Sequence, residues 1–435
     1  MNNKLIIIIV SLFILLIGFV GSDMIEGTFY ITLFFSLTLI FFGFHRFFVE
    51  FSTFKIALLG FGIMIFLDIA SFHFIDPKPI KKSSLIFALI YSYLSFLIFL
   101  IGYNFTKKAY RKVNNNPKSF SMYKFEKIII PISFIFLIVF AVLQVLYPAE
   151  TKNPFFLLIS FLPKATTVLF FLFYLETRKK KYLIFFLIFM MFSLTETSRR
   201  IYITLFFILL PIFIGYFNYR NKILPRRTKN FLVIIGLSFF IFLNYLRANH
   251  DFGEGYKEDN LIGNTWHYII SLKSLDTFYN TTFIIENFPN RFNYYLGETY
   301  SSVLFMFVPR AIWLDKPVGF AAPLGVLQRN GEQDFTLAEW QEINMYSLSP
   351  GFIGEAYANL GIIGIITLSF VFGVQCKKFD LSFRPEMMYH NYKYVSYFAW
   401  CAAFFLLLRG DFFSAVYFSV FYFIFIRLIV KYCQN

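Results

Sequence analysis

Six cations stand beside apolar runs where their side chains could bind an anion. They are Arg199, Arg200, Arg247, Arg310, Lys316 and Arg409. The guanidinium fork of arginine binds phosphate oxygens through two parallel hydrogen bonds and does not lose its proton. Several arginines at the ends of membrane helices therefore predict a site for a pyrophosphate group. A lone arginine at a helix end usually reaches the lipid headgroups, so the prediction rests on their number.

One charged stretch, VPRAIWLDKP at 308–317, stands apart from the surrounding apolar sequence. Pro309 and Pro317 stiffen it, and Trp313 can stack on a sugar or anchor at the membrane interface. Its cations, Arg310 and Lys316, can face an anion or the headgroups. An interfacial anchor uses the same residues, so this stretch alone fits both interpretations equally.

Composition places these residues in a membrane protein. The chain has 435 residues, of which 58% are hydrophobic and 15% charged, with a mean hydropathy of +0.64. Its apolar runs repeat at membrane-spanning length, which one soluble core would not require. The net charge of +15 is scattered through short loops and forms no basic face, so we expect no nucleic-acid partner.

About twelve apolar runs are long enough, or nearly so, to cross a bilayer as helices. They lie near residues 5–20, 28–44, 54–74, 84–103, 128–147, 155–175, 182–197, 201–217, 231–247, 351–374, 394–409 and 412–430. Backbone polar groups in hydrocarbon must be satisfied within the segment, which favours helices. The sequence therefore predicts an all-α polytopic membrane protein.

Lysine and arginine in the short loops predict the orientation. The basic loops are 104–127, 176–181, 218–230 and 376–393. Alternation of the spans places all four on one face, which should be cytoplasmic together with both termini. The loop 75–83 carries Lys78, Lys81 and Lys82 on the other face and is an exception.

Three regions follow from this topology. Residues 1–247 hold nine predicted helices, 248–350 form a large extracytoplasmic loop, and 351–435 hold three more helices. The loop has twelve acidic residues against six Lys or Arg. Apolar spacing in 266–285 predicts an amphipathic helix lying along the membrane surface. No disulfide is expected in the loop, because Cys376, Cys401 and Cys433 all lie outside it.

The motifs in their order along the chain resemble those of the bacterial oligosaccharide repeat-unit polymerases, the Wzy-type O-antigen polymerase family. They are TSRR at 197–200, YLR at 245–247, LGETY at 296–300, VPRAIWLDKP at 308–317, SPGFIGEAYANLGIIG at 349–364 and LLRGDF at 407–412. PRAIWLDKP followed by GFIGEAYANLGIIG is the most specific part. The N-terminal runs match only as generic spans.

This resemblance implies a membrane glycosyltransferase of the bacterial cytoplasmic (inner) membrane. It would join undecaprenyl-pyrophosphate-linked oligosaccharides at the outer face and move the growing chain onto each new lipid-linked unit. A flippase and a chain-length regulator of the same pathway are the expected protein partners, besides the membrane lipids. No metal or other cofactor is expected, because the sequence has no Asp-x-Asp pair and no cluster with metal-ligand spacing.

Displacement at an anomeric carbon needs a base for the acceptor hydroxyl and a cation for the departing pyrophosphate. We expect Arg199, Arg310 and Arg409 to stabilise the leaving group. The second pyrophosphate would bind Arg200, Arg247 and Lys316. Glu355 is the first candidate base, followed by His250 and Asp276. The substrate-binding candidates beyond the cations are Trp313, Asp276, Glu298 and Tyr300.

Three other functions fit parts of this pattern. An O-antigen ligase uses the same donor with another acceptor, so only an acceptor assay distinguishes it. A flippase for the lipid-linked oligosaccharide should carry charges at mid-membrane depth, where Asp68 and Lys164 are among the few. A receptor without catalysis would need the outer loop alone.

Overall fold

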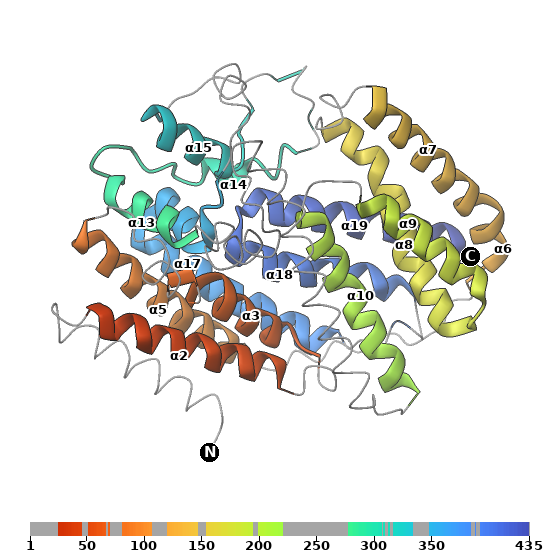
Figure 1. Cartoon of the computed structure of the whole chain (residues 1–435), viewed down its shortest axis with the longest axis horizontal. Helices are drawn as coiled ribbons and strands as arrows, with labels where there is room; N and C mark the ends of the chain where they lie inside the picture. The colour runs from red at the N-terminus through yellow and green to blue at the C-terminus, as the bar shows by residue number, and fades with distance from the viewer. Residues whose placement is uncertain are drawn as a thin grey trace, which may run out of the picture.

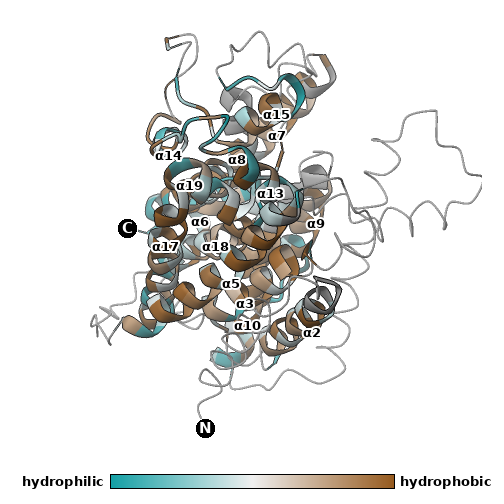
Figure 2. Ribbon diagram, turned by 90° about the vertical axis from the view of Figure 1, so that its left-hand side faces the viewer, coloured by the Kyte–Doolittle hydropathy of each residue, from teal (hydrophilic) through white to brown (hydrophobic). Residues whose placement is uncertain are grey.

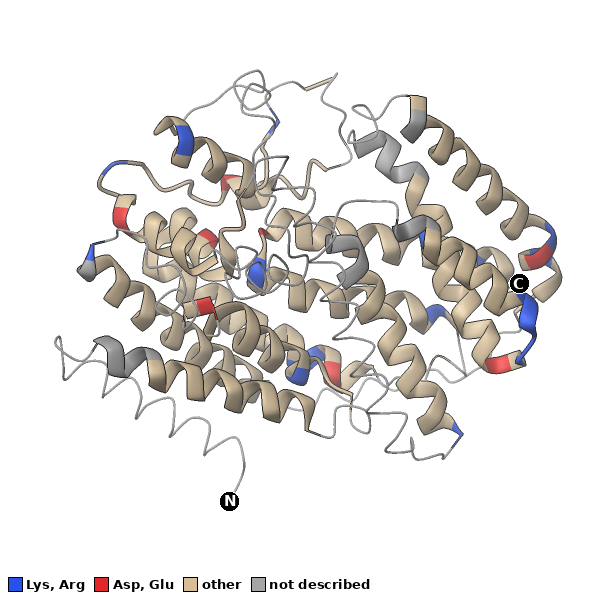
Figure 3. Ribbon diagram, in the orientation of Figure 1, with Lys and Arg blue, Asp and Glu red and all other residues tan. Residues whose placement is uncertain are grey.

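The computed structural model of the chain is mostly helical, and no strand occurs among the residues that it describes (Figure 1). The described residues are 25–45, 51–66, 68–69, 81–106, 120–146, 154–194, 199–220, 277–306, 308, 312–313, 316–333, 348–383, 388 and 392–434. Brown, hydrophobic residues dominate the helices in Figure 2, as the apolar runs of the sequence require. Charged residues are sparse along the helices in Figure 3.

The helices of the first half follow the predicted apolar runs. They are α2 (Ile25–Phe44), α3 (Thr53–Gly60) with the π-helical turn η1 (Phe61–Phe66), α5 (Lys82–Phe105), α6 (Met122–Lys124) with η2 (Phe125–Ile129), α7 (Ile130–Leu146), α8 (Pro154–Thr177), α9 (Lys180–Leu194) and α10 (Arg199–Tyr219). Pro163 lies within α8, where its ring removes one backbone hydrogen bond and the helix nevertheless continues.

The second half supplies the short helices and the last long ones. They are α13 (Thr277–Asn287), α14 (Glu298–Ser301), α15 (Ala321–Asn330), α17 (Gly351–Ser382), the 3-10 helix η7 (Tyr392–Phe398), α18 (Ala399–Arg409) and α19 (Phe412–Cys433). In Figure 1, α13, α14 and α15 lie at one side of the bundle, while α6 and the C-terminal end of α19 lie at the opposite side.

Within the described ranges, four helices are long and apolar enough to cross a membrane. They are Ser83–Phe105, Met122–Leu143, Gly351–Ser382 and Phe412–Cys433. Shorter apolar helices are Tyr30–Phe44, Thr53–Phe66 and Thr204–Tyr219. The predicted runs at 5–20 and 231–247 lie outside the described residues. The total of about twelve spans, the three regions and the extent of the outer loop therefore stay predictions.

Helix α17 is broken near its start, which the predicted continuous span 351–374 did not include. Leu360 has φ −139° and ψ 17°, and Gly361 has φ 60° and ψ −148°, which is a backbone conformation essentially confined to glycine. The break frees main-chain carbonyls. Those of Ala358 and Asn359 accept hydrogen bonds from Tyr295 N and Leu296 N, both at 3.0 Å. The segment 295–296 thus satisfies backbone groups that the helix cannot.

Helix α5 holds α17 in place along its length. Ser95 and Ser369 share a hydrogen bond of 2.8 Å between the two helices, and Phe99 packs on Phe372 at 5.3 Å. Asp380, near the far end of α17, accepts hydrogen bonds from Thr53 N at 2.6 Å and from the Tyr103 hydroxyl at 2.9 Å. These contacts fix α17 relative to α3 and α5.

The helical part of the predicted surface helix is confirmed from Thr277 onward, but its surface location is wrong. Helix α13 contacts α5 and α17, and Phe278, Ile284 and Ile285 are buried. Neighbouring helices cover the described part of the apolar stripe, which removes the reason for this part to lie on lipid. Residues 266–276 lie outside the described part of the chain.

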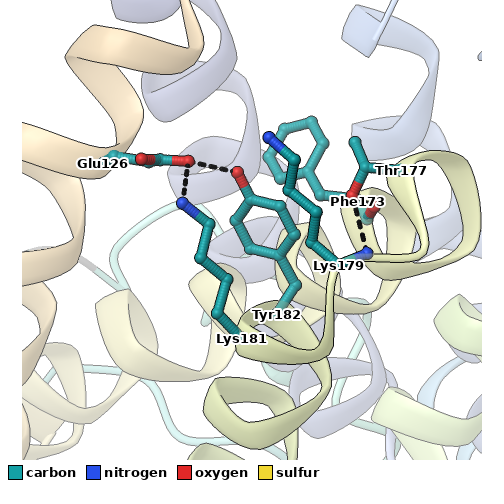
Figure 4. Close-up of polar contacts among 6 residues, drawn as sticks. All are labelled: Glu126, Phe173, Thr177, Lys179, Lys181 and Tyr182. Atoms are coloured by element: carbon teal, nitrogen blue, oxygen red, sulfur yellow. Dashed lines mark hydrogen bonds and ion pairs between the residues drawn. The ribbon is translucent and has the colours of Figure 1, made fainter.

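Segments from three predicted cytoplasmic loops meet at the far side of the bundle. Glu126 in η2 bonds Lys181 Nζ at 2.7 Å and also the Tyr182 hydroxyl, as Figure 4 shows beside the turn at Thr177. Tyr392 donates to Glu176 at 2.5 Å. The Glu126 and Lys181 side chains are 32% and 45% exposed, so this ion pair contributes at most about 1 kcal/mol. The ion pair nevertheless shows that two basic loops lie at the same end of the bundle.

Candidate functional site

Four of the motif segments meet at the end of the bundle opposite these basic loops. They are 295–300 before and within α14, 316–320 before α15, the first half of α17 and the turn between α18 and α19. Segment 295–300 bonds to the break in α17 through two main-chain hydrogen bonds. Phe320, the last residue of the segment 316–320, packs on Tyr295, with 5.4 Å between the two ring centroids. Segments far apart in the sequence thereby form one cluster.

The turn between α18 and α19 follows from its Arg-Gly-Asp sequence. Arg409 ends α18, where a cation stabilises the negative end of the helix dipole. Gly410 N then donates to the carbonyl oxygen of Leu406 at 2.8 Å. Asp411 is the N-cap of α19 and accepts from Ser414 N at 3.3 Å. The tight turn fixes Arg409 and Asp411 two residues apart at one helix junction.

Glu355 lies in the first half of α17 and reaches this turn. Its Oε2 accepts a 2.6 Å hydrogen bond from Phe412 N, the first residue of α19, and its Oε1 accepts from the Thr299 hydroxyl at 3.3 Å. The side chain is 1% exposed. A buried carboxylate requires such donors, because desolvation otherwise strongly disfavours its charge.

Asn359 stands one turn after Glu355 on the same face of α17. Its Nδ2 donates to Thr299 Oγ1 at 2.8 Å and to the Glu355 carbonyl oxygen at 2.9 Å. Its Oδ1 accepts from Gly297 N at 3.1 Å. Every polar atom of this side chain therefore bonds either α17 or the segment 295–300.

The segment 316–320 packs directly on the turn. A Cβ atom at Gly319 would lie 2.4 Å from Asp411 Oδ2 and 2.6 Å from Phe413 Cβ. Only glycine allows this approach. This contact connects the residues directly after VPRAIWLDKP to LLRGDF.

Tyr300 closes the cluster on the side of α14. Its ring meets Phe412 edge to face at 5.3 Å. Burial and the nearby Glu355 carboxylate raise the pKa of the Tyr300 hydroxyl above its usual value of 10. Tyr300 is therefore neutral at physiological pH and can donate a hydrogen bond.

The two described members of VPRAIWLDKP with predicted roles are Trp313 and Lys316. Trp313 is 38% exposed and its ring packs on Phe305 at 4.9 Å. Lys316 Nζ donates to the Val308 carbonyl oxygen at 2.7 Å, which connects the two residues near the ends of this stretch. Glu298, also predicted to bind substrate, is exposed at the start of α14.

Asp68, predicted as a deep charge, lies at this same end. Its carboxylate accepts a 2.6 Å hydrogen bond from Phe278 N in the first turn of α13. It also lines a small cavity together with Thr277, Gly351 and Leu408. Leu408 directly precedes Arg409, so the cavity borders the α18–α19 turn. Lys164 is completely buried in α8, where its Nζ donates to Ser160 Oγ at 2.7 Å.

Arg199 and Arg200 begin α10, and the structure describes their backbone only. Phe207 of α10 packs on Phe405 of α18 at 4.6 Å. The other end of α10 is tied to the basic loops, because Arg178 donates to the Tyr216 hydroxyl at 2.8 Å. The start of α10 therefore lies towards the end of the bundle at which α18 ends with Arg409.

The remaining predicted site residues cannot be placed. They are Arg247, His250, Asp276 and Arg310, which lie outside the described residues. Within the described ranges, no group of three or more His, Cys, Asp or Glu side chains could hold a metal ion. The structure thus brings Glu355, Tyr300, Glu298 and Arg409 into one region of the bundle and leaves the other assignments as predictions.

Two residues of the cluster escaped the sequence analysis, Thr299 and Asn359. Both are neutral, whereas most of the predicted site residues are charged. Asn359 had a usable signal, since an asparagine inside an apolar run must find partners for its amide. The sequence Asn359-Leu360-Gly361 also has a glycine where a helix would end, which is typical of a helix C-terminus.

Comparison with known proteins gives one match. The family model described as O-antigen polysaccharide polymerase Wzy matches residues 4–435, essentially the whole chain. No curated protein and no solved structure matches the chain.

Proposed function

This chain belongs to the O-antigen polysaccharide polymerase Wzy family, and we propose that it polymerises undecaprenyl-pyrophosphate-linked repeat units at the outer face of the cytoplasmic membrane. It is a membrane protein of polysaccharide biosynthesis. The family match over the whole chain carries the proposal. Its support in the structure is the cluster of four motif segments at one end of the bundle.

The proposed reaction exchanges a bond between a sugar and a pyrophosphate for a glycosidic bond between two sugars. A hydroxyl of the new lipid-linked unit attacks the anomeric carbon of the growing chain. The bond between that carbon and the pyrophosphate oxygen breaks, and undecaprenyl pyrophosphate leaves with the electron pair. The hydroxyl proton passes to a base. The growing chain thereby becomes attached to the new lipid carrier.

The cations are assigned to the two pyrophosphate groups. Arg199, Arg310 and Arg409 stabilise the departing one, while Arg200, Arg247 and Lys316 hold the one that stays. The assignment of Arg409 is supported by its position at the α18–α19 turn. The assignments of Arg199 and Arg200 are supported by helix α10, whose start lies towards that turn. Removal of one such donor typically lowers the rate by about 10²–10³-fold.

Sugar binding is assigned to the segments 295–300 and 308–317. Trp313 offers a ring face and an indole donor, Glu298 offers an exposed carboxylate, and Tyr300 a neutral hydroxyl. Asp276 directly precedes α13 and belongs to the same group by prediction. These side chains suit the several hydroxyls of an oligosaccharide.

The orientation follows from the two ends of the bundle. The end with Glu126, Lys181 and Tyr392 is assigned to the cytoplasm, because its loops are rich in Lys and Arg. The opposite end, with α13, α14 and α15, is then extracytoplasmic. The C-terminus is also cytoplasmic in this assignment, since Ser121 N bonds the Cys433 carbonyl oxygen at 2.8 Å.

The genetic test deletes the gene in its host and resolves the surface polysaccharide on a gel. We expect the ladder to collapse to a single repeat unit, wild type to restore it, and Arg310→Ala or Arg409→Ala to fail while still entering the membrane. Long but unattached polymer in the deletion strain would identify a ligase, and loss of lipid-linked units from the outer leaflet a flippase. A C-terminal alkaline phosphatase fusion should stay inactive, because its disulfides form only outside the cytoplasm.

A further inference from the structure

Glu355 has the residue type of a general base, but its surroundings are those of a residue that holds other segments in position. A base must come within about 2.6–3.2 Å of the acceptor hydroxyl, or reach it through one water. Both carboxylate oxygens of Glu355 already face donors of the protein itself, Phe412 N and the Thr299 hydroxyl. The side chain is 1% exposed, and these two protein donors occupy both of its oxygens.

The hydrogen bonds around Glu355 run in series through three segments. Asn359 Nδ2 donates to Thr299 Oγ1, the Thr299 hydroxyl donates to Glu355, and Glu355 accepts from Phe412 N. Asn359 also accepts from Gly297 N, and its main-chain carbonyl accepts from Leu296 N. The series therefore connects the broken start of α17, the segment 295–300 and the start of α19.

The last member of the series fixes the turn that carries Arg409. Phe412 directly follows Asp411, and Arg409 lies three residues before Phe412. Holding Phe412 N holds the N-terminus of α19 at a fixed distance from α17. A shift of about 1 Å in a group that stabilises charge can cost about 10²-fold in rate. The residues that hold this turn therefore matter to the reaction without touching substrate.

We propose that Glu355 and Asn359 are positioning residues, which hold Arg409 in place through the α18–α19 turn, and that the base of the reaction is a different residue. The inference rests on the proposed function. It leaves His250 and Asp276 as the candidate bases.

The variant Glu355→Gln distinguishes a positioning residue from a general base. The amide oxygen of glutamine can still accept from Phe412 N, and its NH2 group can donate to Thr299 Oγ1 once the threonine hydroxyl rotates to Asn359 Oδ1, 3.2 Å away. If Glu355 is a positioning residue, Glu355→Gln should lower the rate by at most about fivefold, which corresponds to weakening one hydrogen bond. Loss of a base costs about 10²–10⁴-fold.

The assay follows extension of lipid-linked repeat units by the purified full-length protein in liposomes. We expect Glu355→Ala and Asn359→Ala to lose about tenfold to 100-fold, because each leaves buried polar groups without a partner. Glu355→Gln should stay within about fivefold of wild type and keep the wild-type pH–rate profile. Ser369→Ala removes a buried hydrogen bond of α17 away from the turn and should leave the rate unchanged.

A double mutant tests whether Glu355 acts through Arg409. Arg409→Lys keeps the charge but not the guanidinium fork, so it should retain a measurable rate. If Glu355 acts by placing the fork, Glu355→Ala added to Arg409→Lys should cost clearly less than it costs in wild type. Fully multiplicative losses would overturn the link to Arg409.

The remaining outcomes are equally decisive. Glu355→Gln as inactive as Glu355→Ala in a protein of normal thermal stability would make Glu355 a base and overturn the inference. Glu355→Ala with the wild-type rate would also overturn it. A wild-type protein that does not extend the lipid-linked unit would overturn the proposed function, and the inference with it, whereas the first two outcomes leave the proposed function intact.

Discussion

Glu355 has no donor within its own helix and takes both of its hydrogen bonds from segments distant in the sequence, Thr299 and Phe412 N. The sequence alone predicted Glu355 and Arg409 as site residues, because charges beside membrane helices are costly. It could not identify Thr299 or Asn359, because the value of a neutral side chain depends on its partners.

Gly319 provides a prediction at the scale of a single residue. A Cβ atom there would lie 2.4 Å from Asp411 Oδ2 and would have to displace the turn or the segment 316–320. We expect Gly319→Ala to lower the free energy of unfolding by about 1–3 kcal/mol and to shorten the polymer ladder. Melting temperature and gel would be measured together.

Val318→Ala is the control for Gly319→Ala, because it changes the adjacent residue without adding volume. Wild-type stability and a wild-type ladder in Gly319→Ala would show that the approach of the segment 316–320 to Asp411 is not required.

Helix α17 agrees only in part with the helix predicted from the sequence. Its start at Gly351 and its apolar body agree with the predicted run, but that run contained no break at Leu360 and Gly361 and did not extend to Ser382. Membrane helices tolerate glycine, so the glycine-rich sequence fitted a straight span equally well. The break depends on donors from Tyr295 and Leu296, which only the folded chain brings to it.

The break itself can be tested with Gly361→Ala. Alanine at φ 60° and ψ −148° is strained, and its Cβ would meet the Tyr294 hydroxyl at 3.0 Å. We expect a loss of about 1–3 kcal/mol in the free energy of unfolding, seen as a lower melting temperature in detergent. Activity should fall as well, because the first half of α17 carries Glu355.

Leu360→Ala is the matched variant, since Leu360 lies at the same break with a negative φ and a partly exposed side chain. It should melt close to wild type. Equal melting of the wild-type and Gly361→Ala proteins would instead mean that the break carries no strain for other residues.

At the scale of the whole molecule, the two ends of the bundle differ in chemistry. One end gathers segments of the basic loops around Glu126 and Glu176, and the other gathers the motif segments around the α18–α19 turn. Loop charges and motif order predicted this separation from the sequence. The packing of α13 against α5 and α17 could not be predicted, because an amphipathic stripe fits lipid and protein equally well.

The most direct test of the polymerase assignment uses purified wild-type protein in liposomes, with the lipid-linked repeat unit as the sole substrate. We predict a ladder of lipid-linked oligomers and one released undecaprenyl pyrophosphate for each new glycosidic bond, with newly labelled units at the lipid-linked end of the chain. A lipid-linked unit that stays monomeric, in a protein that folds and inserts normally, would contradict the account.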